Sequence, residues 1–76
     1  MNPDQNGILV FRTNLASEEV VHAIRPVLDR HPAILHWNVD QHDVDKVLRV
    51  SACGICAIDV ARLVQAAGFI CEELPD

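Results

Sequence analysis

The feature of this 76-residue sequence that most constrains its fold is the change in apolar spacing along the chain. Continuous or alternating apolar residues, which are typical of strands, occupy residues 8–11, 33–40, 46–51 and 69–74. Residues 17–31 and 56–67 instead carry apolar residues at the three- and four-residue intervals of a helix that packs one face on a sheet. The predicted order is therefore strand, helix, strand, strand, helix, strand.

This order predicts a particular architecture of the α+β class. Two strand–helix–strand units joined by a hairpin form a ferredoxin-like β-α-β-β-α-β open-faced sandwich, a four-stranded antiparallel sheet with two helices on one face. Residues 1–6 are polar and are expected to be a flexible lead-in, and residues 7–76 a single domain, because a chain this short has room for one core. Within that core we expect Leu48 and Val50 to face inward.

Local signals set the expected limits of the helices and the faces of the strands. Ser17 can cap the free amide groups of the first helix, which should end before Pro32. Pro26 lies inside that helix, where a proline costs about 3 kcal/mol unless the helix bends, so we predict a kink near residues 22–25. Alternation in the second strand predicts that Leu35, Trp37 and Val39 share one side.

Composition excludes several classes of function. A net charge of -5 with only six Lys and Arg residues argues against partners such as nucleic acid and anionic membranes. No apolar run approaches the roughly 20 residues of a membrane span, and the first residues do not resemble a signal peptide, so we expect a cytoplasmic location with free thiols. We do not expect an enzyme, because no catalytic triad, paired carboxylates or Gly-rich phosphate loop can be assembled.

Two stretches resemble a known family. Residues 33–40, Ala-Ile-Leu-His-Trp-Asn-Val-Asp, resemble the GVxxVxVD second strand of heavy-metal-associated (HMA) domains, and residues 60–69 resemble their second helix, which ends in AGY. The resemblance spans roughly residues 7 to 73. Residues 37–40, 45–50 and 71–76 also look like those of a group of small bacterial proteins related to that domain. The resemblance implies the same open-faced sandwich.

The family resemblance fails at the metal loop. Metal-carrying HMA domains hold a soft ion such as Cu(I) between two cysteines of an MxCxxC sequence that follows the first strand, because thiolates favour soft cations. In this sequence the loop is Thr13-Asn14-Leu15-Ala16-Ser17, which contains no cysteine. The resemblance therefore implies an HMA-like protein that lacks the usual metal site.

A Cys53-Gly54-Ile55-Cys56 pair precedes the second helix instead. We expect this junction to lie at the same end of the sheet as the junction between the first strand and the first helix. The spacing can turn both sulfurs toward one point, and the amide dipoles of a helix start favour thiolates. The pair could hold Cu(I), or Zn(II) if a histidine, a carboxylate or a second chain completed the shell. The leading hypothesis is therefore a soft-metal carrier or buffer whose partner is a metal-accepting protein with a basic face.

Three alternatives to a metal-binding pair remain open. By its spacing Cys56 could belong to the apolar stripe of Val60, Leu63 and Ala67 and be a buried packing residue, with Cys53 a loop residue. The pair is also compatible with thioredoxin-like redox chemistry, although no cis-proline element is evident. Finally, the domain could have lost metal binding and act as a protein-interaction or dimerisation module.

The remaining polar and thiol groups predict no further site. The four histidines are scattered over different predicted elements and form no local ligand set. The three aspartates of the predicted hairpin turn lack the frame of a calcium loop. We interpret Cys71 as a packing residue, and Glu72 and Glu73 as edge charges that discourage aggregation.

Overall fold

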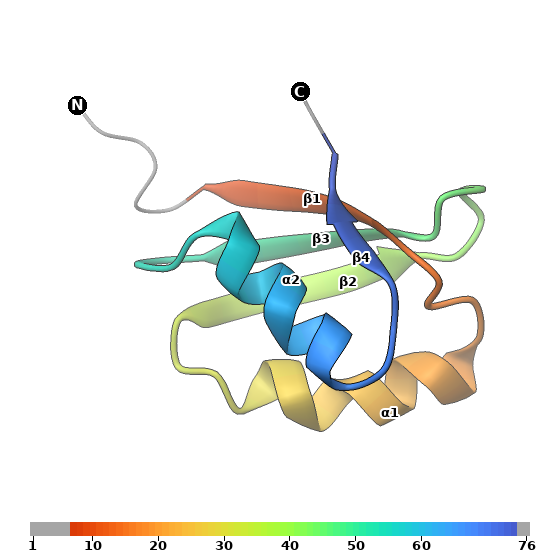
Figure 1. Cartoon of the computed structure of the whole chain (residues 1–76), viewed down its shortest axis with the longest axis horizontal. Helices are drawn as coiled ribbons and strands as arrows, with labels where there is room; N and C mark the ends of the chain where they lie inside the picture. Colours follow the sequence, from red (N-terminus) through yellow and green to blue (C-terminus); the bar gives the residue numbers. More distant parts are fainter. Residues whose placement is uncertain (1–6, 75–76) are drawn as a thin grey trace.

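Figure 1 shows the computed structural model of the chain, which describes residues 7–74. The elements in chain order are β1 (Ile8–Thr13), α1 (Glu18–Asp29), β2 (Ile34–Asp40), β3 (Val47–Ala52), α2 (Ala57–Ala66) and β4 (Cys71–Glu73). This order confirms the one predicted from the apolar spacing. The predicted lead-in at residues 1–6 lies outside the described residues, as do residues 75 and 76.

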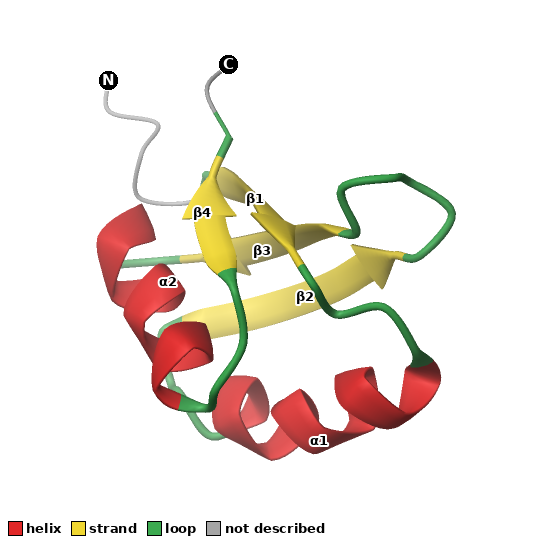
Figure 2. Ribbon diagram, turned by 45° about the vertical axis from the view of Figure 1, so that its right-hand side comes forward, coloured by secondary structure: helices red, strands yellow, loops and turns green. Residues whose placement is uncertain are grey.

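The four strands form one sheet in the order β2-β3-β1-β4, and all neighbouring strands are antiparallel. β1 lies between β3 and β4, a central position that suits the continuous apolar run of residues 8–11. Both helices pack on the same face of the sheet (Figure 2). The predicted ferredoxin-like sandwich is therefore confirmed.

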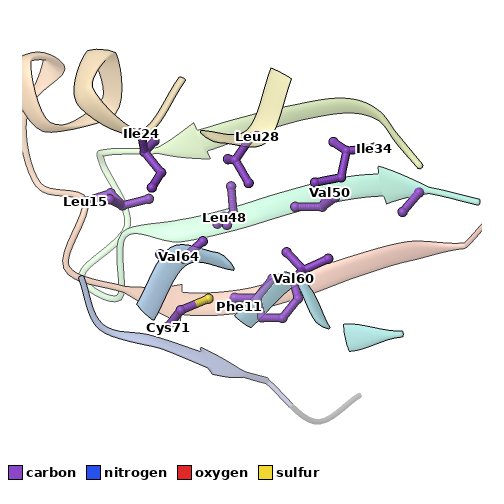
Figure 3. Packing of buried hydrophobic residues seen from close by; sticks show 11 residues of the cluster. Phe11, Leu15, Ile24, Leu28, Ile34, Leu48, Val50, Val60, Val64 and Cys71 are labelled. Atoms are coloured by element: carbon purple, nitrogen blue, oxygen red, sulfur yellow. The ribbon is translucent and has the colours of Figure 1, made fainter. Parts of the chain in front are cut away.

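The hydrophobic core lies between the helices and one face of the sheet (Figure 3). Leu48 and Val50 on β3 are fully buried there, as predicted. The other largest fully buried side chains are Phe11, Leu15, Ile24, Leu28, Val60, Val64 and Cys71. Burial of about ten apolar side chains, each worth roughly 1.5–3 kcal/mol, is the main favourable term for a chain without disulfides.

Helix α1 begins at the predicted cap. The Ser17 hydroxyl accepts a hydrogen bond from the Val20 N–H at 3.3 Å, and the helix ends at Asp29, before Pro32. The segment that we predicted to be kinked, residues 22–25, is helical, and the Pro26 carbonyl accepts the N–H of Arg30 at 3.2 Å. Within residues 7–74, neither helix is long and apolar enough to cross a membrane.

The predicted face of β2 is wrong at one residue. Ile34 and His36 pair with consecutive residues of β3, so Leu35 is an extra residue in a β-bulge. Ile34 consequently enters the core, whereas the Leu35 side chain is 59% exposed. Trp37 and Val39 follow the bulge and pack against the core as the alternation predicted.

The last strand is shorter than predicted. Gly68 has a φ of 99°, the left-handed conformation expected of a glycine that ends a helix. Residues 69 and 70 then belong to the connection, and β4 comprises only Cys71–Glu73. Its Glu72 forms an ion pair with Arg12 on the neighbouring β1.

Candidate metal site

The Cys53–Cys56 loop connects β3 to α2. The Cys53 N–H donates a hydrogen bond to the Ala33 carbonyl at 2.9 Å, which continues the sheet by one bond beyond β3. Gly54 follows with a φ of 88°, a conformation that only glycine adopts at little cost. Cys56 has an extended backbone and stands at the N-cap of α2. The glycine turn thus places one cysteine at the strand end and the other at the helix start.

Both cysteine side chains of this loop are exposed to solvent. The interpretation of Cys56 as a buried packing residue is therefore wrong. Cys56 precedes the helix, with φ -94° and ψ 162°, so its side chain does not continue the helical stripe that buries Val60 and Val64. The Cys56 N–H donates to the Asp59 carboxylate at 3.2 Å, which occupies one of the free amides of the first turn.

Cys71 has a different environment. Its side chain is 1% exposed on the core face of β4. Burial, with a smaller contribution from the neighbouring Glu72, raises the pKa of the Cys71 thiol from 9.0 to about 11. Because it is buried and its pKa is raised, this thiol is less suited to metal binding than an exposed one, which agrees with its interpretation as a packing residue.

Within the described part of the chain, the two exposed cysteines have no third metal ligand beside them. Among residues 7–74, no three histidine, cysteine or acidic side chains are grouped so that they could hold a metal ion. His31, in the connection from α1 to β2, accepts the Ala33 N–H at 3.2 Å through its Nδ1 atom. Two thiolates suit the soft Cu(I) ion, whereas tetrahedral Zn(II) would need two ligands from outside these residues.

The cysteine loop lies at the opposite end of the sheet from the β1–α1 loop, so the prediction of a shared end is wrong. Because β1 and β3 are antiparallel, Phe11 near the end of β1 pairs with Leu48 near the start of β3. The chain accordingly leaves β1 at one end of the sheet and leaves β3 at the other (Figure 1). The CxxC pair therefore does not replace the HMA metal loop at a neighbouring position.

The β1–α1 loop is occupied by structural hydrogen bonds. The buried Thr13 hydroxyl donates to the Lys46 carbonyl at 2.6 Å and accepts the Leu15 N–H at 3.1 Å. The Asn14 side-chain oxygen accepts the Ile70 N–H at 2.9 Å. These contacts tie the loop to the β2–β3 turn and to the α2–β4 connection. Sequence reasoning missed this role, and the only signal for it was the pair of short polar side chains directly after a strand.

Comparison with known proteins identifies the class of fold. No family model matches the sequence, and no curated protein matches it. Among solved structures, one described as "Crosstalk between Cu(I) and Zn(II) homeostasis" is similar with a TM-score of 0.77 and 14% identity, covering 90% of this chain and 99% of that chain. The apo form of the HMA domain of the copper chaperone for superoxide dismutase is similar with a TM-score of 0.75 and 17% identity, covering 99% and 76%. The chain thus has an HMA-like fold.

Proposed function

We propose that this chain is a small HMA-like protein that binds a soft transition metal through Cys53 and Cys56 and acts as a carrier or buffer. The supporting observation is that both thiols of one short loop are exposed, while the third cysteine is buried. Cu(I) is the preferred ion because two thiolates satisfy it, and Zn(II) binds only with ligands from a second molecule. The descriptions of the two similar structures, which name copper or zinc, agree with this choice.

The exposure of the pair suits transfer rather than permanent storage. A partner's thiolates can approach an exposed two-coordinate ion and replace Cys53 and Cys56 one at a time, so the ion is never released to water. The net charge of -5 favours a partner with a basic face. In this role the protein catalyses no reaction.

A competition titration tests the proposal. The reduced protein is titrated with Cu(I) against a chelator of known affinity, in parallel with a Cys53→Ser, Cys56→Ser double variant that retains Cys71. A Cys71→Ala variant, which keeps the exposed pair, is the matched control. We expect stoichiometric binding in the wild type and in Cys71→Ala, and its loss in the double variant. Equal, weak binding in all three proteins would refute the proposal.

A second candidate function is a protein-interaction module without metal. The observation that favours it is the β1–α1 loop, which contains no cysteine and in which Thr13 and Asn14 form structural hydrogen bonds. Binding measurements with isolated partner proteins, made in the absence of metal and with the Cys53→Ser, Cys56→Ser variant, distinguish the two functions. A monomer with tight metal binding and no partner would exclude the module.

A further inference from the structure

The outer edge of β2 is the least protected part of the sheet. β2 is an edge strand of seven residues, and among residues 7–74 no segment pairs with its outer side. The opposite edge strand, β4, has only three residues and carries Glu72 and Glu73. Short length and charge are common protections of sheet edges, and β2 has neither along residues 36–39. Its one irregularity, the bulge at Leu35, lies before this regular stretch.

A groove runs beside this edge, between α1 and β2. Two adjoining hollows of about 440 and 530 Å³ share Val21, Arg25 and Val39 in their walls. Trp37 lies in the first hollow, where its Nε1–H donates to the Asp29 carboxylate at 2.8 Å. The Arg25 guanidinium stands 5.4 Å from the centre of the same ring. The Trp37 ring is thus held in place beside the unpaired edge of β2, its own strand.

The two faces of β2 differ in chemistry. Trp37 and Val39 pack on the helix side. The alternate residues His36, Asn38 and Asp40 therefore project from the open face of the sheet. The Asp40 carboxylate accepts the His42 N–H through one oxygen, at 3.0 Å, and its second oxygen can accept another donor.

This arrangement is self-complementary. In an antiparallel pairing of two β2 strands about a twofold axis through Asn38, His36 of each copy lies opposite Asp40 of the other. Asn38 then faces its own counterpart, and on the helix side Trp37 faces Val39. Cross-strand pairs of opposite charge and pairs of aromatic with β-branched residues both stabilise antiparallel ladders. A twofold axis through Trp37 would instead place His36 opposite Asn38 and Asp40 opposite the bulge. That register loses the pair of opposite charges, so the register centred on Asn38 is favoured.

We propose that the β2 edge binds a second copy of this chain through residues 36–40 and forms a continuous eight-stranded sheet. The interface is isologous, as expected of a twofold dimer. It is also independent of the proposed metal site, because the cysteines lie in the β3–α2 loop and not on β2. With one strand pair and one groove per copy, the interface is small, and the dimer forms in a concentration-dependent manner.

Sedimentation equilibrium tests this proposal. The reduced protein is measured with a metal chelator up to a concentration of about 1 mM. We expect a monomer–dimer equilibrium. His36→Asp should weaken dimerisation about tenfold, because both cross-strand pairs become repulsive. His36→Lys, the matched control, should dimerise like the wild type, and the His36→Asp, Asp40→His double variant should regain affinity because the opposite charges are restored.

Two control measurements show whether a change in dimerisation comes from the β2 edge and not from unfolding or from the cysteines. Circular dichroism and urea unfolding at low concentration establish that each variant is folded, and the Cys53→Ser, Cys56→Ser variant should dimerise unchanged. A protein that stays monomeric at all concentrations overturns the proposal. So does a dimer that His36→Asp leaves intact, or one that is lost with the two cysteines. Failure of the Cu(I) titration leaves this test unaffected.

Discussion

The three cysteine side chains share one chemistry but lie in different surroundings. Cys53 is at the end of a strand, Cys56 is at the start of a helix, and Cys71 is inside the core. Thiol reactivity depends on access and on the thiolate fraction, and burial reduces both for Cys71. The structure thus separates two exposed thiols, which reagents and metal ions can reach, from one buried thiol that contributes to packing.

Thiol labelling measures this separation. At about pH 8 we expect a thiol reagent to label two cysteines per folded chain quickly, and the third only after denaturation. The Cys53→Ser, Cys56→Ser variant should show no fast phase, and Cys71→Ala should keep it in full. Fast labelling of all three cysteines in the folded protein would contradict the buried position of Cys71.

The raised pKa of Cys71 also predicts a pH dependence of stability. The thiol loses its proton near 9.0 in the unfolded chain and near 11 in the folded chain. Between these values the unfolded state binds fewer protons, so the free energy of unfolding falls as pH rises from about 9 to about 11. Below this window the contribution is constant.

Urea unfolding at a series of pH values checks the size of this effect. The Cys71→Ala variant should be less stable at neutral pH, because it leaves a small cavity, but it should lose less stability between pH 9 and 11. Parallel pH profiles for the two proteins would show that Cys71 does not titrate differently in the folded state.

At the level of single elements, α1 shows packing overriding propensity. Pro26 is unfavourable in a helix interior, yet α1 is helical from Glu18 to Asp29. Ile24 and Leu28, on either side of the proline, are fully buried against the sheet. Their burial, together with the Ser17 cap, outweighs a penalty of about 3 kcal/mol.

Replacement of Pro26 by alanine should therefore stabilise the protein. The Pro26 side chain is exposed, so no core contact is lost. We expect the free energy of unfolding to rise by about 1–2 kcal/mol, which is the helix penalty reduced by the greater freedom of the unfolded chain. Pro32→Ala, an exposed proline outside the helix, is the control and should not stabilise. A less stable Pro26→Ala protein would mean that the proline contributes contacts of its own.

The limits of the elements were predictable to different degrees. Ser17 and Gly68 act through hydrogen bonds and backbone angles within one or two turns, so the helix ends could be predicted from neighbouring residues. The position of the Ile34 side chain in the core could not be predicted in this way, because a bulge depends on the register between β2 and β3. The later start of β4 has the same origin, since the chain first pairs with β1 at Cys71.

At the scale of the whole molecule, the two ends of the sheet carry loops with different surroundings. One end holds the β1–α1 loop, which Thr13 and Asn14 tie to two neighbouring connections. The other end holds the exposed Cys53–Cys56 loop. The hydrogen-bonded β1–α1 loop and the exposed cysteine loop are thus separated by the length of the sheet (Figure 1).

Removal of the Thr13 hydroxyl tests how much the tied end contributes. In Thr13→Val the Leu15 N–H and the Lys46 carbonyl lose their partner in a buried site. We expect the free energy of unfolding to fall by about 2 kcal/mol or more, and by about 1 kcal/mol in Thr13→Ser, which keeps the hydroxyl. Urea unfolding measures both. A Thr13→Val protein that is at least as stable as Thr13→Ser would assign the effect to the methyl group, which valine keeps and serine lacks.

The order of elements, the two helix faces and most of the core follow from the spacing of residues close together in the chain. The end of the sheet at which Cys53 and Cys56 lie does not, because it depends on β1 and β3 running in opposite directions. The exposure of Cys56 depends likewise on the angle at which the chain enters α2, and the unprotected edge depends on β2 being outermost. Apolar spacing is a local property, whereas strand direction, register and edge position arise only when distant segments pair.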